Sequence, residues 1–284
     1  MAGSENSKAI VFGLSGWLGD RSGGAMEGAA ALANSASRIF KGDPVQLGRP
    51  EAPGSLPWRA ALDRAMPYLL EVRETVSTAF RDGRRPLIFA NRCAAGLATL
   101  PAVMTSAPDA AVLWFDAHGD FNTPESSSTG YLGGMPLAAM CGFWDAGIGP
   151  CLTPDRVALV GARDLDPAEK RLIEENHVRV IPPVDGRIDL DAVLAHVAKR
   201  PVWIHIDLDV LEPDCLPTEY QVAGGITPDT LRDVLAALAG RNRILGLEVA
   251  EFDLVPERFD ADFATILDMI APITAELFGC TAVR

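Results

Sequence analysis

Two apolar segments of this chain each run into acidic or imidazole side chains at alternate positions, and this repeated pattern restricts the fold more than any other feature. The apolar runs cover residues 112–115 and 201–206, and the polar residues that follow them are Asp116, His118, Asp120, Asp207 and Asp209. Largely apolar runs of this length are typical of parallel strands that are buried on both faces. Because alternate residues of a strand share a face, each polar set is expected to converge where its strand leaves the sheet.

The rest of the chain alternates between apolar runs and amphipathic segments, which predicts βαβ units around a parallel sheet with both faces covered. Strands are expected at residues 9–14, 86–90, 112–115, 156–161, 178–181 and 244–249, with another beginning at Val202. Helices are expected at residues 25–40, 57–80, 167–176, 190–198, 227–238 and 260–278. Pro67 predicts a kink or break, and Pro272 a bend. We therefore predict one α/β domain over residues 1–284.

Polar clusters follow five of the expected strands, after residues 90, 115, 161, 206 and 249. In open α/β sheets the ligands bind at this carboxyl edge, so a site is expected there. Taken alone, the segment D-A-H-G-D is equally well explained as a polar turn, because short motifs match by chance. The second segment favours a metal site, because acidic groups packed at one edge repel each other unless divalent cations neutralise them.

Composition excludes several classes of partner. The chain has 25 basic and 38 acidic residues and a net charge of -13, which argues against nucleic acid and anionic membranes as partners. No apolar run approaches the roughly 20 residues of a membrane span, and the N-terminus lacks the pattern of a signal peptide. Five cysteines without a C-x-x-C motif favour a reducing compartment, so we expect a cytoplasmic protein. The sequence leaves homo-oligomer formation open.

The four histidines are expected to play different roles. His205 is in phase with Asp207 but lies one pleat deeper in the sheet, so it is interpreted as a supporting core residue and not as a ligand. His177 and His196 fall at the ends of expected helices and are interpreted as surface residues. Only His118 is expected to reach a metal.

The segments D-A-H-G-D-F-N-T-P and H-I-D-L-D-V-L-E-P resemble the two strongest signatures of the arginase, or ureohydrolase, superfamily. G-G-M-P, A-R-D-L-D-P and E-V-A-E match in the same order, so the resemblance covers the chain from about residue 86 onward. It implies a three-layer α/β/α fold with a central, mostly parallel sheet. It also implies two Mn²⁺ ions and hydrolysis of guanidino carbon–nitrogen bonds in a small guanidino amino acid.

The resemblance further implies which side chains hold the two ions. One ion would be bound by Asp116, His118, Asp207 and Asp209. The other would be bound by Cys93, Asp116, Asp120 and Asp207, so the two aspartates common to both sets would bridge the ions. Cys93 stands where arginases have a histidine, and its alternative interpretation is an inert buried cysteine.

Catalytic and substrate-binding roles follow from the same resemblance. Asp120 would accept a proton from water and pass it to the leaving nitrogen, and Glu251 would pair with the guanidino group. The substrate-binding residues would be Asn122, Ser127, Thr129, Asp166 and Glu251. Simpler structural explanations exist for four of these, namely a helix cap at Asp166, an Asx-turn at Asn122, and plain loop positions at Ser127 and Thr129.

Three departures from the arginase pattern bear on the substrate. Cys93 replaces a histidine, Gly133 replaces the histidine thought to shuttle protons, and T-E-Y replaces a T-G-T stretch after Pro217. The cysteine and the glycine recur together in a branch of the superfamily that serves antibiotic biosynthesis and cleaves Nω-hydroxy-L-arginine to hydroxyurea and L-ornithine. We therefore expect a manganese amidinohydrolase in which Cys93 and the space beside Gly133 select the hydroxylated substrate.

Two alternatives remain open on the sequence alone. The first is the same chemistry on L-arginine, agmatine or a guanidino acid. The second is a metal-binding relative without catalytic activity.

Overall fold

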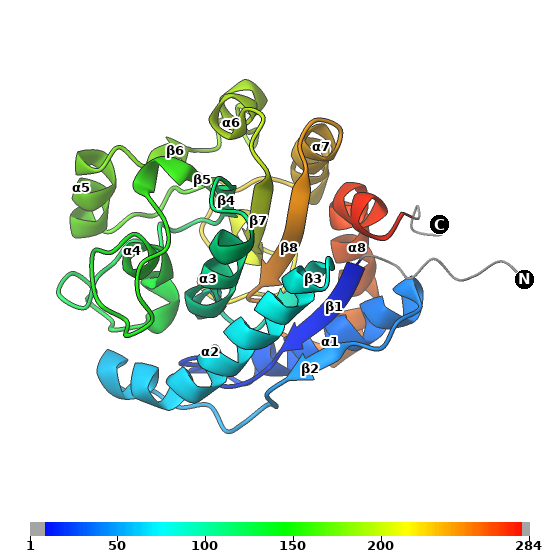
Figure 1. The fold of residues 1–284 in the computed structure, drawn as a ribbon, viewed down its shortest axis with the longest axis horizontal. Helices are drawn as coiled ribbons and strands as arrows, with labels where there is room; N and C mark the ends of the chain where they lie inside the picture. The colour runs from blue at the N-terminus through cyan, green and yellow to red at the C-terminus, as the bar shows by residue number, and fades with distance from the viewer. Residues whose placement is uncertain (1–8, 280–284) are drawn as a thin grey trace, which may run out of the picture.

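The computed structural model describes residues 9–279, and its central element is an eight-stranded sheet in which all neighbouring strands are parallel (Figure 1). The strands are β1 (Ala9–Leu14), β2 (Val45–Leu47), β3 (Arg85–Ala90), β4 (Ala111–Phe115), β5 (Val157–Val160), β6 (Arg179–Ile181), β7 (Val202–Asp207) and β8 (Ile244–Ala250). Their order across the sheet is β2-β1-β3-β8-β7-β4-β5-β6. Residues 1–8, which were considered as a possible signal peptide, lie outside the described residues, and so does Cys280.

Helices cover both faces of this sheet, which gives the expected three-layer α/β/α arrangement (Figure 1). One face packs against α2 (Trp58–Arg81), α3 (Gly96–Ser106), α4 (Pro136–Met140) and α5 (Pro167–Glu175). The opposite face packs against α1 (Gly24–Phe40), α6 (Leu190–Val197), α7 (Pro228–Ala239) and α8 (Phe259–Phe278). None of the helices among residues 9–279 is long and apolar enough to cross a membrane.

The alternation of side chains along each strand divides the interior into two apolar cores. In β3, Ile88 and Ala90 belong to the core under α2 and α3, whereas Leu87 and Phe89 belong to the core under α1 and α8. Because both faces are buried, these strands consist almost entirely of apolar residues. The same alternation decides which polar side chains reach the site at the strand ends.

Two details of the secondary structure differ from the expectation. Helix α2 continues through Pro67, so the expected break is wrong. Pro67 lies on the exposed side, where water can satisfy the carbonyl group that its missing N–H leaves open. The strand β2 and the helix α3 were not expected, because β2 has three residues and α3 is buried around most of its circumference and so lacks an amphipathic pattern.

The order of the strands determines where a site can form. β3 and β4 follow one another along the chain, but β8 and β7 lie between them in the sheet. The carboxyl ends of β3, β8, β7 and β4 are therefore neighbours, and the crossover leaves a crevice at that edge. All the polar clusters that carry candidate metal ligands leave the sheet there.

Candidate active site

Four neighbouring strands deliver the central side chains of the candidate site. Asp207 is the last residue of β7, Glu251 directly follows β8, and Asp116 directly follows β4. Cys93 comes from the short 3₁₀ helix η1 (Cys93–Ala95) after β3. The strand alternation does not extend as far as predicted, because Asp209 lies in the 3₁₀ helix η4 (Leu208–Val210) and not in a strand.

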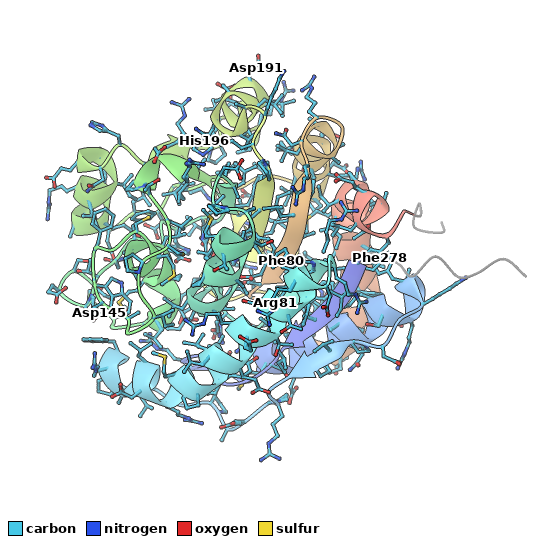
Figure 2. All side chains as sticks on the ribbon, in the orientation of Figure 1. Phe80, Arg81, Asp145, Asp191, His196 and Phe278 are labelled. Atoms are coloured by element: carbon cyan, nitrogen blue, oxygen red, sulfur yellow. The ribbon has the colours of Figure 1, made fainter. Side chains whose placement is uncertain are left out.

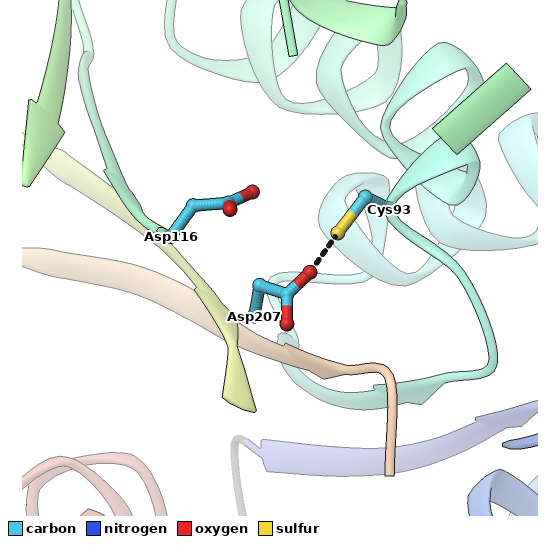
Figure 3. Close-up of side chains that lie close together, drawn as sticks. All are labelled: Cys93, Asp116 and Asp207. Atoms are coloured by element: carbon cyan, nitrogen blue, oxygen red, sulfur yellow. Dashed lines mark hydrogen bonds between the residues drawn. The ribbon is translucent and has the colours of Figure 1, made fainter. Parts of the chain in front are cut away.

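One group of potential metal ligands consists of Cys93, Asp116 and Asp207, and Figure 3 shows these side chains pointing toward one another. Their ligand atoms all lie within 4.8 Å of one another. The Cys93 thiol donates a hydrogen bond to Asp207 Oδ2 at 3.0 Å (Figure 3). A buried sulfur and two buried carboxylates at this spacing can hold a divalent cation.

A second group shares one residue with the first and consists of Asp116, His118 and Asp209. His118 Nδ1 lies 2.9 Å from Asp209 Oδ2 and 3.3 Å from Asp116 Oδ1. Because Asp116 belongs to both groups, its carboxylate would be a ligand in each of them. Asp207 belongs to the first group only, and its Oδ1 accepts a hydrogen bond from the Asp209 backbone N–H at 2.8 Å.

Asp120 belongs to neither group but lies beside the first. The indole N–H of Trp114 donates to Asp116 Oδ2 at 3.1 Å and to Asp120 Oδ2 at 3.2 Å, and so ties the two carboxylates together. Asp120 and Glu251 both have left-handed backbones, with φ of 54° and 67°. Such conformations are uncommon outside glycine and cluster at functional sites, which is consistent with catalytic roles for these two residues.

Crowded negative charge dominates the electrostatics of the site. Burial raises the pKa of Asp207 and Asp120 well above the usual range, and the neighbouring carboxylate of Asp116 raises both further. Burial and the same neighbour raise the pKa of Asp209 to about 6. Burial and Asp207 also raise the pKa of the Cys93 thiol. Oxygen-rich groups that share too much negative charge are relieved by divalent cations, so these residues fit a two-metal centre.

His118 balances part of this charge as an imidazolium. Burial alone would lower its pKa, but hydrogen bonds to Asp116 and Asp209 outweigh burial and raise it to about 12. A cation would have to displace this proton in order to bind the ring nitrogen. Metal binding is therefore expected to release a proton from Cys93 in the first ligand group and one from His118 in the second.

His205 lies beneath the site, as its position in the pleat predicted. The ring is fully buried, stacks on Trp114 with centroids 3.5 Å apart, and has Nδ1 2.8 Å from Glu248 Oε1. Its Nε2 lies 3.3 Å from Cys93 Sγ. It belongs to neither group of ligands and instead supports the side chains above it.

The other two histidines are away from the site. His177 is exposed, as expected. His196 is half-buried on α6, where Figure 2 shows it, and its Nε2 lies 3.3 Å from the carbonyl oxygen of Arg156.

A pocket opens beside the two groups of ligands and brings the expected substrate residues together. It is lined by Asn122, Ser127, Thr129, Asp166 and Glu251, along with Cys93, His118, Asp120, Asp207 and Asp209. Asn122 Nδ2 donates to Asp166 Oδ2 at 3.0 Å, so the amide and the carboxylate act as one unit. Asp166 also caps α5 in a capping box with Glu169, which confirms the structural explanation for this residue.

Ser127 and Thr129 stabilise the loop that carries them. Ser127 Oγ accepts from the backbone N–H of Gly130 at 3.0 Å, and Thr129 Oγ1 accepts from the backbone N–H of Tyr131 at 3.3 Å. These contacts agree with the loop interpretation, and both residues still face the pocket.

A buried arginine behind the pocket was not predicted from the sequence. Arg92 is fully buried, and its Nη1 donates to Glu251 Oε2 at 2.6 Å and to Glu219 Oε2 at 2.7 Å. Its Nε donates to Asp20 Oδ1 at 2.8 Å. Burial raises the pKa of Glu251 to about 7, although Arg92 and the Cys93 amide favour its charged form.

The pairing of Arg92 with Glu219 links two of the departures from the arginase pattern in space. Arg92 directly precedes Cys93, and Glu219 lies in T-E-Y, so the ion pair joins the segments in which two of the departures occur. The signal was present in the sequence as an arginine next to a candidate ligand. Its partners, however, come from three distant parts of the chain.

Several further residues of the pocket wall were not predicted, among them Arg21, Tyr131 and Glu169. Arg21 Nη2 donates to the carbonyl oxygen of Thr129 at 2.9 Å, and its guanidinium carbon lies 5.0 Å from the ring centre of Tyr131. Burial raises the pKa of Glu169 to about 7, while the backbone N–H groups of Phe121 and Asp166 stabilise its charged form.

The expectation of open space beside Gly133 is wrong. A Cβ atom at Gly133 would lie 2.4 Å from Cε1 of Tyr131, so the tyrosine ring occupies the space that the missing histidine side chain would leave. The glycine is required because the ring packs directly against its backbone.

Comparisons with known proteins agree with this geometry. Residues 24–263 match the arginase family. The chain is 42% identical over 259 residues to the Nω-hydroxy-L-arginine amidinohydrolase of Streptomyces lavendulae, a match that covers 90% of this chain and 94% of the relative. It is 33% identical over 191 residues to the arginase of Bacillus caldovelox, covering 62% and 64% of the two chains. The crystal structure of arginase from Bacillus cereus superimposes with a TM-score of 0.81 at 25% identity, covering 96% of this chain and 98% of that one.

Proposed function

The chain belongs to the arginase family, and from that membership we propose that it is a manganese-dependent amidinohydrolase that cleaves Nω-hydroxy-L-arginine to hydroxyurea and L-ornithine. The observation that carries the proposal is the pair of ligand groups that share Asp116 at the wall of a pocket containing Glu251. The 42% identity to the Streptomyces lavendulae enzyme supports the choice of substrate. A reducing cytoplasm and a single domain over residues 1–284 remain part of the proposal.

The residues present fit two manganese ions. Cys93, Asp116 and Asp207 would hold one ion with Asp120 beside them, and Asp116, His118 and Asp209 would hold the other. Carboxylate and imidazole ligands suit manganese. When bound, a pair of such ions lowers the pKa of water and supplies a hydroxide nucleophile near neutral pH.

The protein's own side chains would then orient the substrate and move protons. Asp120, whose pKa is raised by burial, can take a proton and release it to the leaving nitrogen. Glu251 lines the pocket beside Cys93, whose backbone N–H donates to Glu251 Oε1 at 3.1 Å, and it can hold the guanidino end of the substrate. The hydrogen-bonded pair of Asn122 and Asp166 can hold the amino-acid end.

We expect Arg21 to bind the carboxylate of an amino-acid substrate, because it is the only arginine or lysine among the described residues that line the pocket. Arg21→Gln should raise KM for Nω-hydroxy-L-arginine by about 10-fold, since a charge-assisted hydrogen bond contributes roughly 1.5 kcal/mol or more. Steady-state kinetics with agmatine, which has no carboxylate, should be unaffected. Arg64→Gln is the matched control, because Arg64 pairs with Glu51 outside the pocket. An equal change for both substrates would contradict this role.

The proposed substrate is tested by measuring kcat/KM of the manganese-loaded protein for Nω-hydroxy-L-arginine, L-arginine and agmatine side by side. Wild type should prefer the hydroxylated substrate. Cys93→His should shift the preference toward L-arginine, because a neutral imidazole replaces a charged thiolate beside the cation. Preference of wild type for L-arginine, or full metal content and rate in Cys93→Ala, would show that the proposed roles are wrong.

Gly133→His alone is not an informative variant in this protein. The new side chain would collide with the ring of Tyr131. A histidine at this position therefore has to be combined with a smaller residue at position 131.

A further inference from the structure

A buried pair of titratable side chains, His205 on β7 and Glu248 on β8, lies beneath the candidate metal site. The two residues are partners in the register of these neighbouring strands. His205 Nδ1 lies 2.8 Å from Glu248 Oε1, and both side chains are fully buried. Burying such groups costs free energy even when they are hydrogen-bonded to each other, and the chemistry proposed above does not use them.

The imidazole ring of His205 is fixed in one orientation. It stacks on the indole ring of Trp114, with the ring centroids 3.5 Å apart and an angle of 7° between the planes. The contact between Nδ1 and Glu248 fixes the rotation of the ring within this stack. Nε2 is therefore held in one place, and that place is 3.3 Å from Cys93 Sγ.

The hydrogen bonds of Cys93 indicate which atom donates in this contact. A thiol has one hydrogen, and Cys93 donates it to Asp207 Oδ2 at 3.0 Å. The sulfur can therefore only accept from His205, which requires a hydrogen on Nε2. The other proton of the pair lies between Nδ1 and Glu248 Oε1, so His205 and Glu248 together are neutral whichever of these two atoms holds it.

Cys93 needs such a donor if it is to bind a metal. Metals bind the thiolate form of cysteine, and a thiolate in a buried site is unfavourable unless hydrogen bonds stabilise it. The N–H group of His205 approaches the sulfur from beneath, while the other ligand atoms of its group lie within 4.8 Å of it. Groups that support a metal ligand in this way fix its orientation toward the ion.

We propose that His205, held by Glu248, is a positioning residue that donates an Nε2–H hydrogen bond to Cys93 Sγ and so keeps the sulfur in place as a metal ligand. The inference rests on the proposed function, which supplies the metal ions, and adds the residue that makes a cysteine usable at this position. The second ligand group does not contain Cys93, so its ion should depend much less on His205.

The test compares two substitutions of His205. The side-chain nitrogen of asparagine lies near the place of Nδ1, and that of glutamine lies near the place of Nε2. His205→Asn can therefore still pair with Glu248, but only His205→Gln can donate to the sulfur. In His205→Asn we expect the affinity for one of the two manganese ions to fall by about 10- to 100-fold, the range for loss of a group that supports a metal ligand. His205→Gln should recover most of this loss in a calorimetric titration with manganese.

The Cys93→Ala background shows whether His205 acts through the sulfur. There, His205→Asn should cause no further loss of manganese affinity, because the atom that His205 supports is gone. His196→Asn is the matched control, because His196 Nε2 lies 3.3 Å from the carbonyl oxygen of Arg156 and away from the site. The His196→Asn protein should bind both ions as tightly as wild type does.

Nitrogen NMR of the cadmium-loaded wild-type protein tests the same contact without a substitution. Cd²⁺ is diamagnetic and suits a soft thiolate ligand, and Nε2 of His205 should carry a hydrogen. An Nε2 without a hydrogen, unchanged manganese affinity in His205→Asn, or an equal loss with and without Cys93 would overturn this inference alone. A wild-type protein that binds no manganese would overturn the proposed function together with this inference.

Discussion

Asp207→Asn protein is expected to lose manganese and hydrolytic activity together. Asp207 contributes a buried carboxylate to the ligand group with Cys93 and Asp116, and an amide keeps its shape without its charge. Loss of residues that merely support metal ligands commonly costs about 10- to 100-fold in affinity or activity, so loss of a ligand should cost more than about 100-fold. Metal content per chain and kcat/KM measure the two effects.

In the absence of metal, the Asp207→Asn substitution should not lower the stability of the protein. Without cations, burial and the neighbouring carboxylates Asp209 and Asp116 raise the pKa of Asp207, which means that its charge is unfavourable in the folded state. Asp207→Asn removes this charge, so the metal-free variant should melt at the same temperature as wild type or higher. Wild type should gain stability when manganese is added, and the variant should gain much less.

Asp189→Asn is a suitable control, because Asp189 caps α6 by accepting from the Ala192 backbone N–H and lies outside the pocket. The Asp189→Asn protein should retain the manganese content and the kcat/KM of wild type. An Asp207→Asn protein that binds two manganese ions per chain and works at the wild-type rate would falsify the assignment of Asp207.

The second large effect is expected for Glu251→Gln, which keeps the shape of the side chain and removes its charge. Loss of a charge-assisted pair with the guanidino group should cost on the order of 2–3 kcal/mol, or tens- to hundred-fold in kcat/KM. The variant should also be less stable, because Arg92 loses one of its buried carboxylate partners and keeps Asp20 and Glu219.

A double-mutant cycle with Arg92→Gln separates these two consequences. The stability change of the double variant should be smaller than the sum of the single changes, because the two side chains form an ion pair at 2.6 Å. The loss of kcat/KM from Glu251→Gln should persist in the Arg92→Gln background. Lower stability with unchanged kinetics would mean that Glu251 serves only as a partner of Arg92.

The sequence by itself determined the parallel sheet and the position of the polar clusters at its carboxyl edge. Period-two alternation in residues 202–207 is a local property, and backbone geometry converts it directly into side chains that share a face, whereas His118, Asp120 and Asp209 lie beyond the strand ends. For the same reason His205 could be assigned to the layer beneath Asp207. The helix α3 escaped prediction because a buried helix has no polar face to produce a periodic pattern.

Only the tertiary structure decided which strand ends meet. Strand order places β3 and β8 beside β7, so Cys93 lies 3.0 Å from Asp207, and Arg92 pairs with Glu251 from the end of β8. It also showed that Tyr131 fills the space beside Gly133. These contacts join residues far apart along the chain, and no local pattern records them, because they depend on how strands and loops pack and not on the backbone geometry of any one segment.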